Sequence, residues 1–254
     1  MVKMVTETYI PRNRLFVLDD LSAGQAIELS APQAHYLRNV LRFQDGEIVA
    51  LFNGRDGEWA AQYLSQGKKT ALAQVQQLLR PQNNIPDIWL VFALLKSDPM
   101  DFIAQKATEL GVAALLPART ERTVVGRINI ERMRNHVQEA AQQCERLEVP
   151  MVRECASLDE ILANWDGSRI LLYGDETGAG QSLCGLFPQR PEKLAVLIGP
   201  EGGFSARELD RLRTLPYALG INLGPRILRA ETAALAALTA TQLFWGDWEK
   251  VRGA

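Results

Sequence analysis

The sequence predicts an α/β protein in two parts, a small β-barrel-like domain over residues 1–80 and a larger parallel-sheet domain over residues 81–254. Three observations support this fold class. Short alternating segments separated by turn residues fill the first part. Residues 80–86 contain two prolines and two asparagines without apolar periodicity, which is typical of a linker. Beyond them, apolar runs alternate with helical patterns, which favours a parallel sheet covered on both faces.

In the first part, residues 14–18, 26–29, 47–52 and 59–64 have the pattern of short strands. The turn dipeptides Asn53-Gly54 and Asp56-Gly57 lie between the last two of these segments and predict a connection there. We expect a helix over residues 31–43 that begins at Ser30, because serine is a favoured helix cap. Residues 69–79 fit either a strand or a helix.

In the second part, apolar runs at 88–95, 114–116, 170–173, 194–198 and 219–223 predict strands buried in a parallel sheet. Helical spacing predicts a helix capped by Asp98 and another over residues 130–147. Ser205 and Glu208 have the spacing of a capping box, so a further helix begins there. The alanine-rich segment 230–245 is predicted to be the last helix.

The composition is that of an ordinary globular protein, with 47% hydrophobic and 23% charged residues. No apolar run approaches the ~20 residues that span a bilayer, and the N-terminus lacks the apolar core of a signal peptide. Cys144, Cys155 and Cys184 form no CxxC pair, which favours reduced thiols in the cytoplasm over a metal site. The net charge of −2 disfavours indiscriminate nucleic-acid binding, so any RNA contact must depend on local basic groups.

Two loops at predicted carboxyl ends of strands carry unusual residues, and ligands of open α/β sheets bind at such ends. The first, IGPEGGF at 198–204, has three glycines that let backbone approach a ligand closely. The alternative is a tight turn that leads into the capped helix. The second, LGPRILRAETA at 223–233, places two arginines, a glutamate and a threonine between apolar elements. These polar groups either serve a ligand or form an Arg–Glu ion pair with Thr232 as a cap.

Five segments of the second part, taken in order, resemble the SPOUT superfamily of RNA methyltransferases. They are LKSDPMD at 95–101, QKATELGV at 105–112, RTER at 119–122, and the two loops at 198–204 and 223–233. More narrowly, the chain resembles the RsmE family, which methylates N3 of a uridine in the 16S RNA of the small ribosomal subunit. The first part, with NRLF at 13–16, is similar to the PUA-like RNA-binding domain of that family. Gln142 departs from the family, which favours a carboxylate at this position.

The resemblance implies a SPOUT-type parallel-sheet domain with a trefoil knot, preceded by a small PUA-like β-barrel domain. It also implies a homodimer, S-adenosylmethionine as cofactor, and 16S ribosomal RNA or the small ribosomal subunit as partner. Transferred to matching positions, the cofactor contacts are expected at Tyr173, Gly174, Gly199, Pro200, Glu201, Gly202, Leu223, Gly224, Ile227, Leu228, Arg229, Thr232 and Ala233.

Methylation of uracil N3 requires loss of its proton, because the protonated nitrogen is a poor nucleophile. Either a positioned base removes the proton, or cationic donors stabilise the charge that develops on the carbonyl oxygens. Arg226 and Arg229 suit the second role, and Glu231 or Glu201 suits the first. The sequence does not choose between these roles.

Local basic groups provide the expected RNA contacts, which would be mainly to phosphates. The RNA contacts are expected at Arg12, Arg14, Arg38 and Arg42 in the first part and at Lys96, Lys106, Arg119 and Arg122 in the second.

Two alternative functions stay open: another SPOUT methylase that acts on the ribose of transfer RNA, and a non-catalytic RNA-binding factor in ribosome assembly.

Overall fold

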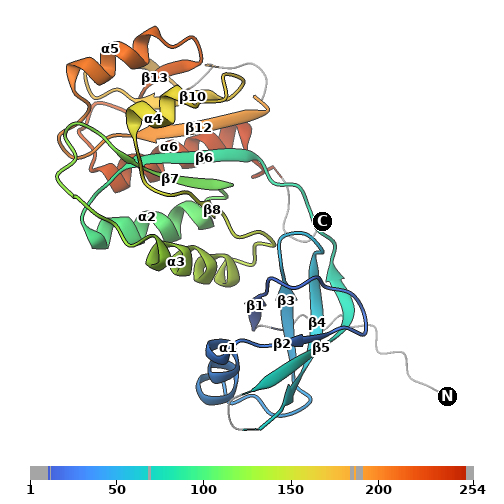
Figure 1. Cartoon of the computed structure of the whole chain (residues 1–254). Helices are drawn as coiled ribbons and strands as arrows, with labels where there is room; N and C mark the ends of the chain where they lie inside the picture. The colour runs from blue at the N-terminus through green and yellow to red at the C-terminus, as the bar shows by residue number, and fades with distance from the viewer. Residues whose placement is uncertain (1–10, 12, 68–69, 184–185, 187–190, 250–254) are drawn as a thin grey trace. The chain divides into compact units, whose positions relative to one another are not determined.

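The computed structural model describes residues 11, 13–67, 70–183, 186 and 191–249 (Figure 1). The chain divides into two compact units. The first comprises Met1–Asn84 together with Ala141–Val149, and the second comprises Ile85–Ala140 and Pro150–Ala254. The first unit therefore also includes a short segment from the later part of the chain.

The first unit contains a five-stranded sheet in the order β1-β3-β4-β5-β2. Strands β1 and β3 pair in parallel, and the other pairs are antiparallel. The inward side chains of the sheet, such as Leu15, Val49, Leu51 and Tyr63, form the core of this unit. The four predicted strands are confirmed, and the ambiguous segment that follows them is a strand. The bounds are β1 Arg14–Phe16, β2 Ala26–Glu28, β3 Ile48–Phe52, β4 Glu58–Ser65 and β5 Ala71–Arg80.

The helical segment of this unit begins at Ser30, as predicted, with a capping box completed by Gln33. The prediction of one regular helix over 31–43 is wrong. Helix α1 (Ala31–His35) gives way to a π-helical turn, η1 (Tyr36–Val40), in which the Leu41 N–H donates to the Tyr36 carbonyl at 3.0 Å. The wider turn keeps Leu37 fully buried in the core, and packing of this kind overrides the regular helical repeat.

Arg14 is buried in the first unit, so the expectation that it contacts RNA is wrong. Its Nε donates to the Glu58 carboxylate at 2.5 Å. Its two terminal nitrogens donate to the carbonyl oxygens of Ala141, Gln142 and Arg146 at 3.0, 2.9 and 2.7 Å. Because every nitrogen of the guanidinium is used inside the protein, Arg14 holds the segment 141–149 against the sheet and offers nothing to a phosphate.

The second unit contains a parallel sheet in the order β11-β13-β10-β12-β6-β7-β8, with β9 also paired to β7. This arrangement confirms the predicted parallel-sheet domain, since each predicted apolar run forms one of its strands. The bounds are β6 Asp87–Ala93, β7 Ala114–Arg119, β8 Met151–Val152, β9 Ala156–Ser157, β10 Ile170–Gly174, β11 Gln181–Ser182, β12 Lys193–Ile198 and β13 Ala218–Asn222.

Helices cover both faces of this sheet (Figure 1). On one face, α4 (Leu158–Ala163) and α5 (Ala206–Thr214) bury Leu162 and Leu212 against sheet residues such as Val91 and Leu197. On the other face, α6 (Ala230–Trp245) packs on β12 and against α2 (Ser97–Glu109). Burial on both faces explains why the strands are apolar throughout rather than alternating.

Two predicted helix limits in the second part are wrong. Helix α2 has Lys96 as its N-cap, so Asp98 lies in the first turn, where its charge favours the helix dipole without capping. Helix α3 (Ile130–Gln143) ends before 147. Glu145 has φ +63°, and this left-handed backbone stops the helix although the apolar spacing continues to Leu147.

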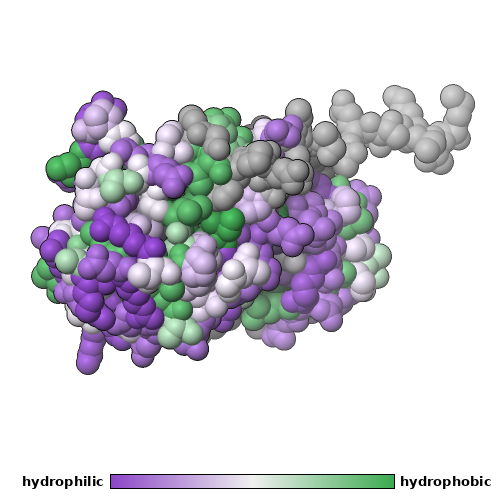
Figure 2. Space-filling model, turned by 90° about the horizontal axis from the view of Figure 1, so that it is seen from above, coloured by the Kyte–Doolittle hydropathy of each residue, from purple (hydrophilic) through white to green (hydrophobic). Residues whose placement is uncertain are grey.

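Hydrophilic residues cover most of the face drawn in Figure 2, and hydrophobic residues lie among them. The large apolar side chains instead fill the interiors of the two units. None of the helices in the described part of the chain is long and apolar enough to cross a membrane.

Replacing Arg14 with methionine should lower the free energy of unfolding by about 3 kcal/mol, because removing one partner leaves the buried Glu58 carboxylate poorly compensated. Urea denaturation measures this change. Arg42→Gln, at an exposed arginine of the same unit, serves as the control and should change stability by less than about 0.5 kcal/mol. An Arg14→Met protein as stable as the wild type would show that the buried pair contributes little.

Candidate functional site

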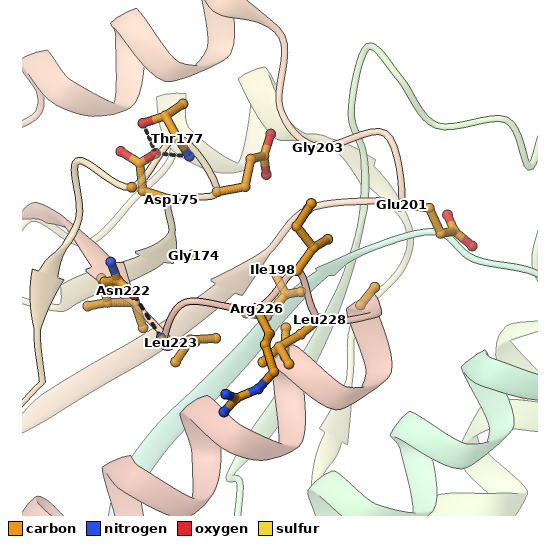
Figure 3. Close-up of a pocket in the computed structure, with 18 of the residues that line it drawn as sticks. Gly174, Asp175, Thr177, Ile198, Glu201, Gly203, Asn222, Leu223, Arg226 and Leu228 are labelled. Carbon is orange, nitrogen blue, oxygen red and sulfur yellow. Dashed lines mark hydrogen bonds between the residues drawn. The ribbon is translucent and has the colours of Figure 1, made fainter.

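A pocket of about 460 Å³ lies beyond the carboxyl ends of three strands of the second unit (Figure 3). Its walls are the loop after β10 (residues 174–178), the loop after β12 (198–203) and the loop after β13 (221–228). Ala230 and Ala233 of α6 complete it. This volume is within the usual range for small-molecule sites, roughly 300–1,000 Å³.

The three loops meet because β10 pairs in parallel with both β12 and β13. Tyr173 is in register with Leu197, and Gly174 is in register with Ile221. The strands therefore end at nearly the same level, and the chain leaves each of them on the same edge of the sheet. That edge is where open α/β sheets bind their ligands.

Two glycines of the loop after β12 lie where another part of the protein comes close to the backbone. A Cβ on Gly199 would lie 3.2 Å from ring carbons of Phe204. Gly203 has φ +68°, and a Cβ there would overlap the carboxylate of Glu176. The loop also leads directly into the capping box of α5, in which Ser205 Oγ accepts from the Glu208 N–H at 3.1 Å. The segment 198–204 can therefore both approach a ligand and form the tight turn that leads into the capped helix α5.

The same loop is held from behind by two further contacts. Glu208 is buried, and one of its carboxylate oxygens accepts from the Glu121 N–H at 2.9 Å. Arg122 donates from Nη1 to the Gly202 carbonyl at 2.7 Å. Arg122, which we expected to contact RNA, therefore supports the wall of the pocket. This contact joins the segment 119–122 to the loop after β12.

The loop after β10 is held by Asp175, which the sequence analysis did not identify. Its carboxylate accepts from the N–H and hydroxyl of Thr177 at 2.9 and 2.5 Å, and from Arg213 at 3.4 Å. Burial by itself would raise the pKa of Asp175, but the hydrogen bonds from Thr177 and Arg213 bring that pKa below its usual value. Asp175 is therefore ionised and its charge is used within the protein.

Glu176, the next residue, has a different environment. It lines the pocket, and the Phe204 N–H donates to its carboxylate from the loop after β12. Burial raises the pKa of Glu176, and repulsion from Asp175 adds to this, while the Phe204 bond and the more distant Arg122 lower it. The position directly after a buried strand is the signal that could have identified both carboxylates.

The loop after β13 turns at Gly224, whose N–H donates to Asn222 Oδ1 at 2.7 Å (Figure 3). Arg226 lines the pocket and is exposed. Arg229 is the N-cap of α6 through its backbone, and its side chain is exposed outside the lining. Among the described residues, neither arginine forms an ion pair with Glu231, and Thr232 does not cap the helix, so the structural alternative for this segment is wrong.

Most of the expected cofactor residues line the pocket, and three do not. Tyr173 is buried in the core beneath the sheet edge, and Arg229 and Thr232 lie outside the lining. Of the expected catalytic side chains, Arg226 and Glu201 line the pocket and Glu231 does not. The expected residues that do line it are Gly174, Gly199, Pro200, Glu201, Gly202, Leu223, Gly224, Ile227, Leu228 and Ala233. The lining residues that the sequence did not indicate are Asp175, Glu176, Thr177, Gly178, Ile221 and Asn222, whereas Ile198, Gly203, Pro225 and Ala230 lie within the two predicted ligand loops.

The expected RNA contacts are in varied environments. Arg12 lies outside the described residues. Arg38 donates to Tyr63, Ser65 and the Thr70 carbonyl at 3.2, 2.8 and 3.0 Å, so its charge is partly used within the first unit. Lys106 pairs with Glu109 at 2.7 Å. The side chains that remain exposed are Arg42, Lys96, Arg119 and Arg122, the last with its bond to the Gly202 carbonyl.

Two family models match this chain. The family model of an RNA methyltransferase domain matches residues 81–242, and that of an RNA methyltransferase PUA domain matches residues 29–76. The ribosomal RNA small subunit methyltransferase E of Rickettsia conorii is 30% identical over 242 residues, which cover 94% of this chain and 98% of the relative. The Bacillus subtilis protein of the same name is 30% identical over 246 residues, covering 89% and 95%.

Two solved structures are similar over almost the whole chain. A Legionella pneumophila protein described as a putative methyltransferase in complex with its cofactor SAM has a TM-score of 0.85 and 31% identity, covering 94% of this chain and 100% of that one. The ribosomal RNA small subunit methyltransferase E of Neisseria gonorrhoeae, bound to S-adenosyl methionine, has a TM-score of 0.84 and 30% identity, covering 93% and 99%. The pocket described above thus belongs to a fold that binds a nucleoside cofactor in its relatives.

Gly203→Ala should lower the free energy of unfolding by about 2 kcal/mol, because a side chain at φ +68° is strained and would displace the Glu176 carboxylate. The adjacent Gly202→Ala is the matched control. Its Cβ would make an ordinary contact 3.6 Å from Arg122 Cβ, so the change should be below about 0.5 kcal/mol. Equal stability of the two variants in urea denaturation would contradict the geometry of this loop.

Proposed function

We propose that this chain, which belongs to the RNA methyltransferase family that includes ribosomal RNA small subunit methyltransferase E, methylates N3 of a uridine in 16S ribosomal RNA with S-adenosylmethionine. The observation that carries the proposal is the pocket itself. Two of its three walls come from the segments 198–204 and 223–233, on which the resemblance rests. Relatives with this fold have been crystallised with the same cofactor.

The residues of the pocket fit S-adenosylmethionine in three respects. Ile198, Ile221 and Leu228 provide an apolar surface for an adenine ring. The backbone N–H and carbonyl groups at the glycines of the two loops can form hydrogen bonds with the ribose and the adenine edge, because glycine has no side chain in the way. The carboxylates in the lining, Glu176 among them, suit a cofactor that carries positive charge. When bound, S-adenosylmethionine supplies a methyl group activated by a sulfonium.

The protein's part in the chemistry is to place the uracil and favour loss of its N3 proton. Arg226 lies in the lining, so its guanidinium can donate to a uracil carbonyl oxygen as negative charge develops there. Glu201, also in the lining and exposed, is placed to accept the proton directly or through water. The sequence alone suited both Arg226 and Arg229 to this donor role, whereas the lining of the pocket supports Arg226.

The proposal also covers RNA binding, the assembly of two copies into a homodimer, and the location in the cell. Arg42, Lys96 and Arg119 are exposed and suited to phosphate contacts. Ile227 lines the pocket with 98% of its surface exposed, which supports a homodimer in which a second copy covers this loop. The trefoil knot and the cytoplasmic location stay predictions that follow from the resemblance.

Mass spectrometry of 16S RNA from a strain that lacks this gene tests the function. One uridine should lose its N3-methyl group, and expression of the wild-type chain should restore the methyl group. A lost ribose methyl in transfer RNA would instead assign the chain to the other SPOUT activity. Complete methylation of both RNAs in the deletion strain would leave a role in ribosome assembly without catalysis.

Arg226→Ala should reduce single-turnover methyl transfer by roughly 10²–10³, the usual loss for one oxyanion donor. Affinity for S-adenosylmethionine should fall much less, because the interaction strengthens only as charge develops on the uracil. Arg229→Ala removes the same charge outside the lining and should cost less activity. Normal turnover in a well-folded Arg226→Ala protein would exclude this role, and a larger loss in Arg229→Ala would return it to Arg229.

A further inference from the structure

Glu176 lines the pocket and, like Glu201, forms no ion pair among the described residues. Its neighbour Asp175 is bound by Arg213 and Thr177, and Glu208, behind the loop, is bound by backbone N–H groups. In the described part of the chain, Glu176 forms no ion pair, and its carboxylate receives one N–H, from Phe204. Glu176 is exposed, so water reaches its carboxylate, and the partial burial of that group raises its pKa.

The Glu176 carboxylate lies close to the loop after β12. Gly203 has φ +68°, and a Cβ on it would overlap the Glu176 carboxylate. The Phe204 N–H donates to this carboxylate. The side chain is therefore held between the loops after β10 and β12, at the level where both face the pocket.

We infer that Glu176 is the carboxylate that holds the positive charge of the cofactor in this pocket. This inference rests on the proposed function, because S-adenosylmethionine carries a sulfonium and an ammonium. Either cation would supply the charge partner that the fold omits, and a charge-assisted contact in a pocket of this kind is a strong one. Glu176 is thus a binding residue that the family resemblance did not identify, and Gly203 is the glycine that makes room for it.

Calorimetric titration of the full-length protein with S-adenosylmethionine and with S-adenosylhomocysteine tests the inference. Glu176→Gln keeps an oxygen that can accept from Phe204 and removes only the charge, so the loop should stay in place. We expect the affinity for S-adenosylmethionine to fall roughly 10- to 100-fold, as for loss of a hydrogen bond to a charged group. Glu192→Gln, at an exposed carboxylate before β12 and so at the opposite edge of the sheet, is the matched control and should bind as the wild type does.

The second ligand identifies which cation is held. S-adenosylhomocysteine keeps the ammonium and lacks the charge on sulfur. An equal loss of affinity for both ligands in Glu176→Gln would assign the contact to the ammonium, and a loss confined to S-adenosylmethionine would assign it to the sulfonium.

Two outcomes would overturn the inference. One is unchanged affinity of Glu176→Gln for both ligands. The other is a loss seen in Glu176→Ala but absent in Glu176→Gln, which would make Glu176 a residue that holds the loop through Phe204 and not through charge. Thermal melts of each variant separate lost binding from lost folding. A wild-type protein that binds neither ligand would count against the proposed function itself, whereas wild-type binding with an unaffected Glu176→Gln counts against this inference alone.

Discussion

Strand β10 lies between β12 and β13 with parallel register on both sides, and the site depends on this pairing. Parallel neighbours end at the same edge of a sheet, so the loops that follow them converge without any need for contacts of their own. Apolar residues on both faces of the strands hold this arrangement against α4 and α5 on one side and α6 on the other. The pocket is therefore a consequence of the sheet, and the loops supply its chemistry.

The polar residues around the pocket divide into those that hold the loops and those that face a ligand. Glu208, Asp175 and Arg122 use their hydrogen bonds within the protein, and each ties a loop from behind. That support leaves glycine backbone, Arg226 and Glu176 at the front. A site built in this way is preorganised, because little conformational freedom is lost when the ligand binds. The division also explains why basic residues in family motifs need not contact RNA.

The first unit shows a similar use of charge. Arg14 and Arg80 both donate to the buried Glu58 carboxylate, at 2.5 and 2.7 Å, and Arg14 also lies 4.4 Å from the centre of the Phe52 ring. This cluster joins the sheet to carbonyl oxygens of the segment 141–149. Gln142 takes part through its side chain, which accepts from the Phe16 N–H at 3.0 Å. The position needs an acceptor, which glutamine provides as well as a carboxylate does, so the departure from the family pattern does not alter this contact.

The sequence by itself determined the elements and the two ligand loops. The apolar runs, the cap at Ser30 and the capping box at Ser205 depend on neighbours along the chain, and the structure confirms the strands and helix starts that they predict. Only the tertiary structure decided that Arg14 is buried, that Arg122 binds the pocket wall, that Arg226 and not Arg229 lines the pocket, and that Glu176 faces it. Each of these depends on strand register and on contacts between residues far apart in the chain. The type and spacing of residues in the sequence do not reveal such contacts, because each side chain is held by partners that come close to it only when the chain folds.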